Sequence, residues 1–481
     1  MDWFRMSARL YPDRFAIIFD DVFYTYRDID MAVDLLCTAL LADYGLLFGR
    51  SVAILLPSNL DYVILIHALI RLGAIAVPLN TKLSASELTK QTAQCDFLLD
   101  VSTLRSKAES GFVVNDYTKK SLGKKDENLT TFDLNRPFAR IFTSGTSGQP
   151  KAAELSLNAI YHSAIASMLR IGHQPTDKWL CTLPLYHVGG LSIIMRAALY
   201  GTCVILQNGF DLEAVNHALD TQGVTLASFV PTMLYRLMEA RVTPPPHLRL
   251  VLLGGAAATP ELVERAHAAG FPIATTYGLT EAASQVCTQL PDDTRRKPGS
   301  VGKPLPFTNL RVIDKNDSDM ALGEVGEIIV NSPTLMTGYV DNPEATAKTL
   351  RDGWLYTGDL GYLDEDGDLW LVQRRSDLII SGGENVYPAE VEAALKSHPS
   401  VRDAVVVGLA HPEWGQQVAA VVVLRPGHVL ITDELTTYLR TRLAGYKLPR
   451  FIKFMDALPL TASGKIERHA VQMLFFNDYA N

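Results

Sequence analysis

Residues 143–151 read TSGTSGQPK, which combines glycines, hydroxyl side chains and one lysine directly after the apolar sequence ARIF. Glycines let the backbone approach a ligand and turn its N–H groups inward, while hydroxyls and an ammonium group add donors and positive charge. The composition favours a phosphate-binding loop, with contacts from Thr143, Ser144, Gly145, Thr146, Ser147, Gly148 and Lys151. The spacing is not that of a Walker loop. A flexible linker is the alternative, but a helical pattern over residues 152–169 follows directly.

A second group of polar residues follows a predicted strand at residues 271–276, FPIATT. The next residues, YGLTEA, bring Tyr277, Thr280 and Glu281 to the end of that strand, where open α/β sheets bind ligands. The structural alternative makes Thr280 a helix cap and Glu281 a first-turn acid.

Two further motifs lie nearer the C-terminus. The sequence YTGD places Asp359 after a Thr-Gly turn, and a hairpin turning at Asp366 and Gly367 separates it from Arg375. Lys465 lies in a Ser-Gly loop, in the sequence SGK. Taken singly, Asp359 is explained by an Asx-turn and Lys465 by a solvated surface charge.

The composition excludes several classes of protein. With 481 residues, of which 48% are hydrophobic and 20% charged, the chain can bury a large core. A net charge of −8 without a basic stripe argues against a nucleic-acid surface. Five scattered cysteines without a CxxC pair predict neither a disulfide framework nor a zinc site, and they fit a reducing cytoplasm. The longest apolar run, residues 60–79, contains charged residues, so we expect no membrane span and no signal peptide.

The apolar runs predict the elements that must position these motifs. Short β-rich segments alternate with helical stretches up to about residue 375, which is typical of sheets covered by helices. We therefore expect an α/β fold with a large N-terminal body, residues 1–375, built from parallel or mixed sheets. Residues 376–481 predict a small α+β domain of two helices and several strands.

The joint occurrence of these motifs, in this order, resembles the adenylate-forming superfamily, which includes acyl- and aryl-CoA ligases, firefly luciferase and peptide-synthetase adenylation domains. The resemblance spans nearly the whole chain. It rests on TSGTSGQPK, PLYHVGG (184–190), LLGGAA (252–257), TTYGLTEA (275–282), YTGD (356–359), RRSD (374–377) and SGK (463–465). One departure is Arg374, where many members carry glycine, which puts only the local turn in doubt.

The resemblance implies an AMP-forming acid–thiol ligase that uses ATP, Mg²⁺ and coenzyme A. It makes Lys465 the catalytic lysine that bridges the acid and the α-phosphate, with Thr280 donating to that phosphate and Glu281 binding Mg²⁺. Such a cation is needed because two unit charges about 4 Å apart repel by roughly 4 kcal/mol at an effective dielectric of about 20. The other nucleotide-binding residues implied are Gly254, Gly255, Ala256, Tyr277, Gly278, Asp359 and Arg375. It also implies a mobile C-terminal domain, hinged at Asp377, and a CoA channel at Gly382 and Gly383.

The acid is harder to predict. By resemblance His187 and Gly190 lie at the acid pocket, and His187 is implied in catalysis or in gating access. Arg196 follows among apolar residues; we favour a structural ion pair for it, with a second substrate carboxylate as the alternative. The compact length and the motif strings look most like a ligase for an aromatic dicarboxylate of menaquinone or phylloquinone biosynthesis.

Three other functions stay open. They are a fatty-acyl or other aryl-CoA ligase, an adenylation enzyme that loads a carrier protein in trans, and a nucleotide-binding protein without turnover. A homo-oligomer is compatible with the sequence, which does not fix the oligomeric state.

Overall fold

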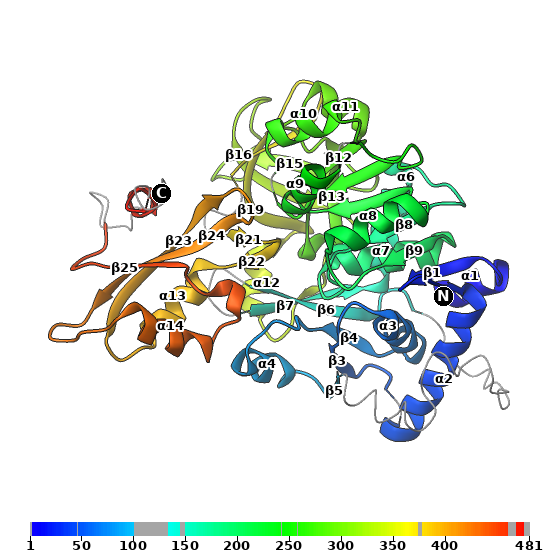
Figure 1. The fold of residues 1–481 in the computed structure, drawn as a ribbon, viewed down its shortest axis with the longest axis horizontal. Coiled ribbons are helices and arrows are strands. Elements are labelled where there is room, and N and C mark those ends of the chain that lie inside the picture. The colour runs from blue at the N-terminus through cyan, green and yellow to red at the C-terminus, as the bar shows by residue number, and fades with distance from the viewer. Residues whose placement is uncertain are drawn as a thin grey trace. The chain divides into compact units, whose positions relative to one another are not determined.

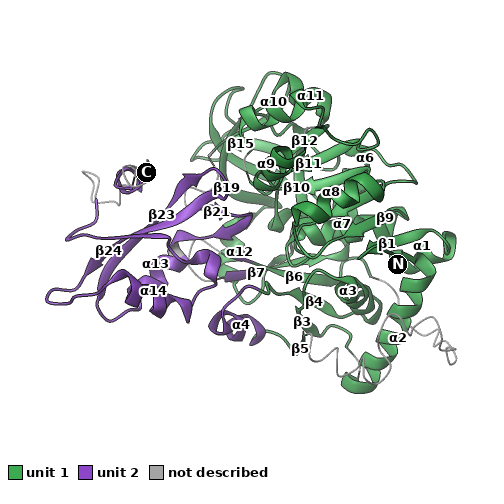
Figure 2. Ribbon diagram, in the orientation of Figure 1, with its two compact units in different colours: residues 1–81, 94–142, 152–372 green, residues 82–93, 143–151, 373–481 purple. Residues whose placement is uncertain are grey.

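The computed structural model divides into two compact units (Figure 2). It describes residues 2–45, 47–100, 133–144, 150–241, 243–256, 258–373, 378–459 and 468–475. The first unit comprises Met1–Thr81, Gln94–Phe142 and Ala152–Val372, and the second Lys82–Ala93, Thr143–Lys151 and Gln373–Asn481. Each unit is thus assembled from three separate stretches of chain. The expected domain boundary at residues 375 and 376 falls outside the described residues and stays a proposal.

The first unit contains a nine-stranded sheet (Figure 1). Its strands, in the order in which they lie across the sheet, are β14 (Lys303–Pro304), β13 (Ser284–Gln289), β12 (Ile273–Leu279), β11 (Leu250–Leu253), β10 (Leu226–Phe229), β8 (Lys178–Cys181), β9 (Cys203–Leu206), β1 (Phe15–Phe19) and β2 (Val22–Thr25). The strands from β12 to β1 are parallel and almost entirely buried, as their unbroken apolar runs predict. The carboxyl ends of β11 and β12 therefore lie at one edge of this sheet.

Two further sheets complete the first unit. The six-stranded sheet has the order β17 (Gly338–Tyr339), β7 (Pro150–Ser156), β6 (Pro137–Ser144), β4 (Ile75–Pro78), β3 (Ser51–Leu55) and β5 (Phe97–Asp100). The five-stranded sheet has the order β15 (Asn309–Ile313), β16 (Gly326–Asn331), β19 (Trp354–Leu363) and β18 (Leu350–Arg351), with β20 (Leu369–Gln373) pairing with β19. Gly367, with a φ of 78°, makes the predicted turn between β19 and β20.

The helices of the first unit form two hydrophobic cores with the sheets. One core joins the larger two sheets through α2 (Tyr26–Tyr44), α3 (Leu60–Leu72), α6 (Leu157–Ile171) and α7 (Val188–Tyr200). The other packs α8 (Leu212–Thr221), α9 (Pro231–Ala240) and α10 (Pro260–Ala268) on the nine-stranded sheet. The remaining helices are α1 (Trp3–Leu10), α11 (Pro291–Arg296) and α12 (Pro343–Thr349), with a 3₁₀ turn, η2, at Thr280–Ala282. The predicted α/β class is confirmed.

The helix predicted over residues 152–169 begins later than expected. Residues up to Ser156 belong to β7, and α6 starts at Leu157 because the Ser156 hydroxyl accepts a hydrogen bond from the N–H of Ala159, at 3.1 Å. Ala152 and Ala153 have high helix propensity, but the strand pairing of the sheet overrides it.

The second unit is built on a sheet with the order β22 (Glu384–Val386), β21 (Ile379–Ser381), β24 (Gly415–Leu424) and β23 (Val401–His411), with β25 (Phe451–Phe454) pairing with β24. The other elements are α13 (Pro388–Lys396), α14 (Thr432–Arg440), α15 (Arg468–Met473), a 3₁₀ turn, η3 (Gly445–Lys447), and α4 (Ala85–Thr92). The predicted α+β pattern holds for its C-terminal part, whereas α4 comes from between two strands of the first unit.

A buried ion triad ties α4 into the second unit. The ammonium of Lys447 lies 2.6 Å from Glu87 and 2.8 Å from Glu390, and no side chain of the three is more than 7% exposed. Burial alone would lower the pKa of Lys447, but the two carboxylates reverse that effect and leave it raised. The second oxygen of Glu390 has no hydrogen-bond partner, and burial raises the pKa of Glu390. One ammonium thus compensates two carboxylates away from water.

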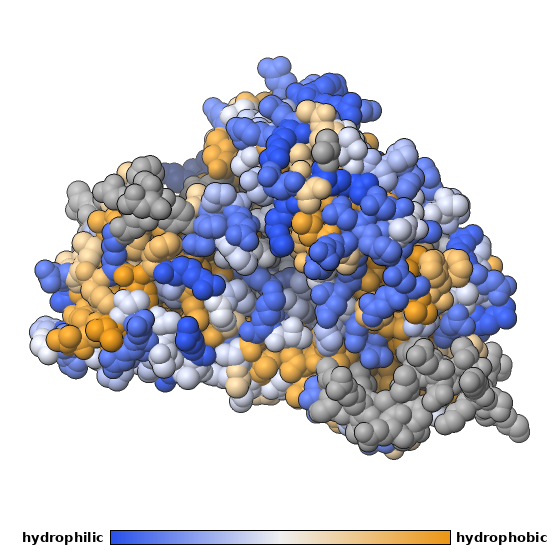
Figure 3. Space-filling view, viewed as in Figure 1, coloured by the Kyte–Doolittle hydropathy of each residue, from blue (hydrophilic) through white to orange (hydrophobic). Residues whose placement is uncertain are grey.

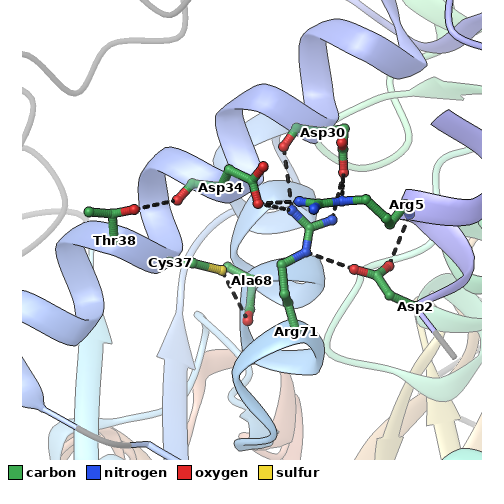
Figure 4. A network of polar contacts seen from close by, with 8 residues as sticks. All are labelled: Asp2, Arg5, Asp30, Asp34, Cys37, Thr38, Ala68 and Arg71. Carbon is green, nitrogen blue, oxygen red and sulfur yellow. Dashed lines mark hydrogen bonds and ion pairs between the residues drawn. The ribbon is translucent and has the colours of Figure 1, made fainter. Parts of the chain in front are cut away.

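A second charge network fastens the N-terminus to α2 and α3 (Figure 4). The Arg71 guanidinium donates to Asp2 at 2.7 Å, to Asp30 at 2.6 Å and to Asp34 at 2.7 Å, and Arg5 bonds to the last two aspartates as well. Asp2 also caps α1 through the N–H of Arg5. One buried guanidinium therefore links three segments of the first unit.

His67 lies beside this network and predicts a loss of stability in acid. It is 2% exposed, packs 4.5 Å from the Phe4 ring, and its Nε2 has no hydrogen-bond partner. Burial lowers its pKa to about 4; the facing Asp2 opposes this shift and Arg71 adds to it. Above pH 6.5 both states hold a neutral ring. As the pH falls from 6.5 towards 4, only the unfolded chain gains the proton, so at pH 5 the native state should lose about 2 kcal/mol.

We expect His67→Leu to remove most of that acid sensitivity. Urea unfolding of the protein and the variant at pH 7 and at pH 5 measures it. An equal loss of unfolding free energy in both proteins would assign the acid sensitivity to other groups.

The face seen in Figure 3 mixes hydrophilic residues with small hydrophobic patches. None of the helices in the described part of the chain has both the length and the apolar character of a membrane span.

Candidate active site

The edge of the nine-stranded sheet carries a glycine turn where β11 ends. A Cβ on Gly254 would lie 2.6 Å from Cγ2 of Thr276, and Gly255 has a φ of 78°. Side chains at these positions would clash or be strained, so the backbone offers a flat surface beside β12. Ala256 follows and is partly exposed. This is the expected position for the edge of an adenine ring.

Tyr277 and Asp359 meet next to that turn, from two different sheets. The Tyr277 hydroxyl donates to Asp359 at 2.6 Å, and the residues are 1% and 8% exposed. Asp359 is held by its own N–H, which donates to the hydroxyl of Thr357, and that hydroxyl bonds to a carbonyl of β16. Gly278 approaches β13 so closely that a Cβ would lie 1.9 Å from the Ser284 carbonyl oxygen. The two predicted nucleotide-binding side chains therefore form one rigid pair.

Glu281 follows Thr280 in the 3₁₀ turn η2, and it is 5% exposed. The turn ends in two left-handed residues, Ala283 (φ 51°) and Ser284 (φ 104°), a strained conformation of the kind found at functional sites. The Tyr339 hydroxyl donates to Oε1 of Glu281 at 2.7 Å. The prediction from sequence missed Tyr339, because it lies 58 residues further on, in a two-residue strand without a motif of its own. A carboxylate held in this way suits Mg²⁺, which prefers oxygen ligands.

His187 and Gly190 begin α7. His187 is its N-cap residue but makes no side-chain cap, and its ring packs 4.7 Å from that of Tyr186. A Cβ on Gly190 would lie 2.4 Å from the carbonyl oxygen of Pro184, so only glycine lets the helix start so close to the preceding loop. The partly exposed His187 ring thus lies at the start of the helix, beside Tyr186.

Arg196 lies two turns further along α7 and is 2% exposed. Its guanidinium lies over the Trp179 ring, 5.6 Å from the centroid, and donates only a long hydrogen bond of 3.4 Å to the Ser284 hydroxyl. Its Nε has no partner, and no ion pair joins it to any carboxylate that the structure describes. Burial lowers the pKa of Arg196. The structural ion pair favoured from sequence is therefore absent among the described residues.

Several predicted site residues lie outside the described part of the chain. These are Gly145, Thr146, Ser147, Gly148, Arg375, Asp377 and Lys465. The residues that flank the glycine-rich loop are described: Thr143 lies in the last two residues of β6, and its hydroxyl donates to the carbonyl of Lys151 in β7, at 3.4 Å. Backbone is described for Ser144 as well. The loop is thus carried between two paired strands.

In the second unit, Gly382 and Gly383 form the two-residue turn between β21 and β22. Both have positive φ, 59° and 84°, which a type I′ hairpin requires. The N–H of Gly382 donates to the carbonyl of Trp414, and a Cβ on this glycine would lie 2.8 Å from the indole ring.

The turn borders a cavity of about 370 Å³ within the second unit. Its lining includes Trp414, Tyr446, Glu384 and two cationic residues, Lys82 and Arg450. Lys82 bonds to Glu384 at 2.9 Å. The cavity combines aromatic faces with positive charge, a combination that suits a phosphorylated nucleotide.

Comparison with known families and sequences gives matches over almost the whole chain. Residues 4–340 match the model of the AMP-binding enzyme family, and residues 390–465 that of the AMP-binding enzyme C-terminal domain. The 2-succinylbenzoate–CoA ligases of Bacillus cereus (strain Q1) and Bacillus mycoides (strain KBAB4) are each 39% identical over 477 residues, 98% of both chains.

Solved structures of a Bacillus subtilis o-succinylbenzoate CoA synthetase are also similar. A double mutant bound with the product analogue OSB-NCoA gives a TM-score of 0.90 at 37% identity, and the complex with the acyl-adenylate intermediate OSB-AMP gives 0.73 at 37%; both cover 98% of each chain. The complex with ATP and magnesium ion gives 0.73 at 37% identity, over 97% of this chain and 98% of that one.

Proposed function

The chain belongs to the AMP-binding enzyme family, and from this premise we propose that it ligates 2-succinylbenzoate to coenzyme A in an ATP-dependent, AMP-forming reaction. The near full-length similarity to ligases of that name supports the activity. We place the enzyme in the cytoplasm and its product in menaquinone or phylloquinone biosynthesis. Assembly into a homo-oligomer stays a prediction.

In the first half-reaction an oxygen of the acid carboxylate attacks the α-phosphorus of ATP, the bond to pyrophosphate breaks, and acyl-AMP forms. The chain needs no nucleophile of its own, so its residues align the reactants and offset charge. The Tyr277 ring is 1% exposed, so its part is to hold Asp359 through its hydroxyl rather than to offer a ring face to the adenine. Asp359 accepts from the ribose hydroxyls, with Arg375 as a second ribose contact. Thr280 donates to the α-phosphate, and the loop at residues 143–151 holds the other phosphates. Glu281 would hold a magnesium ion, which would supply positive charge to the triphosphate.

In the second half-reaction the CoA thiolate attacks the acyl carbon and AMP leaves. We assign the 370 Å³ cavity of the second unit to the nucleotide part of CoA, because Arg450 matches a phosphate and the rings of Trp414 and Tyr446 match a base, whereas Lys82 is paired with Glu384. Gly382 and Gly383 leave room for the pantetheine chain, and Asp377 is the proposed hinge. A carrier protein in trans could present the same thiol group.

Arg196 carries the assignment of the acid. A dicarboxylate keeps one carboxylate after the other is activated, and that charge needs a partner away from water. Arg196 is a buried cation with an unbonded Nε and no acidic partner in the described chain. A fatty acid or a simple benzoate would leave it uncompensated. His187 and Gly190 lie at the start of the same helix, α7, and we place them at the pocket for the acid.

We expect Arg196→Gln to raise the KM for 2-succinylbenzoate by thirtyfold or more, because loss of a buried charge partner costs about 2 to 5 kcal/mol. The KM for an analogue without the second carboxylate should change little. Steady-state pyrophosphate release with both acids measures this, and circular dichroism controls for folding. An equal loss for both acids would make Arg196 a structural residue.

The proposed function itself is tested with a panel of acids. Pyrophosphate release and thioester formation are followed with 2-succinylbenzoate, benzoates and fatty acids, with and without CoA. Preference for another acid would support an aryl- or fatty-acyl-CoA ligase. Adenylate without thioester would support an enzyme that loads a carrier protein, and no turnover would support a nucleotide-binding protein without activity.

A further inference from the structure

Tyr339 is fixed in place more firmly than a packing role requires. It pairs with Ala153 in the six-stranded sheet, and its N–H donates to the Thr346 hydroxyl at 2.9 Å. Gly338 before it has a φ of 155°, and a Cβ there would lie 2.9 Å from Thr346. The side chain is 6% exposed and directs its hydroxyl at Glu281. Strand β17 and helix α12 together thus fix the direction of the Tyr339 hydroxyl.

The same short segment holds Glu281 at two points. The N–H of Met336 donates to the Glu281 carbonyl at 2.8 Å, and Tyr339 donates to its Oε1 at 2.7 Å. The other carboxylate oxygen accepts no hydrogen bond from any residue in the described ranges. One oxygen is therefore committed to the protein and the other is left for a ligand.

We propose that Tyr339 is a positioning residue, which selects the rotamer of Glu281 and so sets the affinity of the site for the divalent cation. The proposal rests on the proposed function, in which Glu281 binds Mg²⁺. Groups that orient metal ligands change metal affinity by about 10- to 100-fold when they are removed. The phenol acts through the carboxylate alone and touches no reacting atom.

The chain supplies a matched control. Tyr277 is also a buried tyrosine whose hydroxyl donates to a carboxylate, Asp359, at 2.6 Å. Tyr339→Phe and Tyr277→Phe each remove one oxygen atom from a buried tyrosine–carboxylate pair. We expect Tyr339→Phe to raise the Mg²⁺ concentration for half-activation of pyrophosphate exchange by tenfold or more, with the KM for ATP at saturating Mg²⁺ changed less than threefold. Tyr277→Phe should instead raise the KM for ATP and leave the Mg²⁺ concentration for half-activation nearly unchanged.

A second readout does not depend on turnover. Binding of Mn²⁺ to the protein at an ATP concentration that saturates both variants, followed by electron paramagnetic resonance, should weaken in Tyr339→Phe and not in Tyr277→Phe. An unchanged metal dependence in Tyr339→Phe, or equal shifts in both variants, would overturn the proposal. If the unaltered protein exchanged no pyrophosphate with any acid, the proposed function would fail, and the Mn²⁺ measurement would still decide the role of Tyr339.

Should Tyr339→Phe not fold, Thr346→Val provides the second test. It replaces with a methyl group the hydroxyl that accepts from the Tyr339 N–H and donates to the Asn342 carbonyl, and we expect a two- to threefold rise in the Mg²⁺ requirement. No rise would count against the proposal.

Discussion

Replacing Lys465 with alanine should lower acyl-AMP formation about a thousandfold and spare the thioester step. The carboxylate and the α-phosphate repel by roughly 4 kcal/mol for each unit-charge pair about 4 Å apart, and each 1.36 kcal/mol on the barrier is tenfold in rate. The proposed role of Lys465 is to offset that repulsion, which exists only before the acyl-AMP bond forms. The second step, attack by a thiolate on a neutral acyl group, has no such requirement.

The two half-reactions can be measured separately. Exchange of labelled pyrophosphate into ATP follows the first, and thioester formation from supplied acyl-AMP and CoA follows the second. Lys465→Arg, which keeps the charge, should retain far more of the exchange than Lys465→Ala. Equal losses of both half-reactions in Lys465→Ala would refute this division of labour.

Replacing Lys447 with methionine should destabilise the second unit by about 3 to 5 kcal/mol, because it leaves Glu87 and Glu390 buried without their cation. The chain offers a control of the same residue type in the same unit. Lys396 lies 2.7 Å from Asp403, but both side chains are 43% exposed, so Lys396→Met should cost less than about 1 kcal/mol.

Urea unfolding of the full chain, with hydrogen exchange of the β23 and β24 amides, measures both variants. Adding Glu87→Gln and Glu390→Gln to Lys447→Met should recover most of the loss, because neutral side chains carry no uncompensated charge. Similar losses in Lys447→Met and Lys396→Met would mean that water reaches the triad.

The sequence predicted the fold class, the family and the motifs of the site, because those depend on local signals. Polar residues such as Tyr277 and Asp359 are recognisable one motif at a time, and the order of the motifs identifies the family. The structure places Tyr277 within β12 and Asp359 within β19, so the turn predicted before Asp359 is part of a strand. The assignment of individual roles stays a prediction, most of all for Lys465.

What the sequence could not predict depends on contacts between distant residues. Tyr339 has no local signal, and its contact with Glu281 exists only because folding brings the two residues together. Glu87 closes a capping box with Ser84, and that local role alone would account for a glutamate at this position. Its other carboxylate oxygen nevertheless bonds to Lys447, 360 residues away. A residue that satisfies one rule can serve a second, distant partner.

The triad also bears on exchanging parts between related ligases. A chimaera that takes its last hundred residues from a relative would import a new lysine and glutamate but keep the host's residue at position 87. The imported lysine would then have to pair with a residue of α4, which lies outside the exchanged segment. Taking residues 82–93 from the same relative as the last hundred residues should restore solubility to chimaeras that are insoluble when only the C-terminal segment is exchanged.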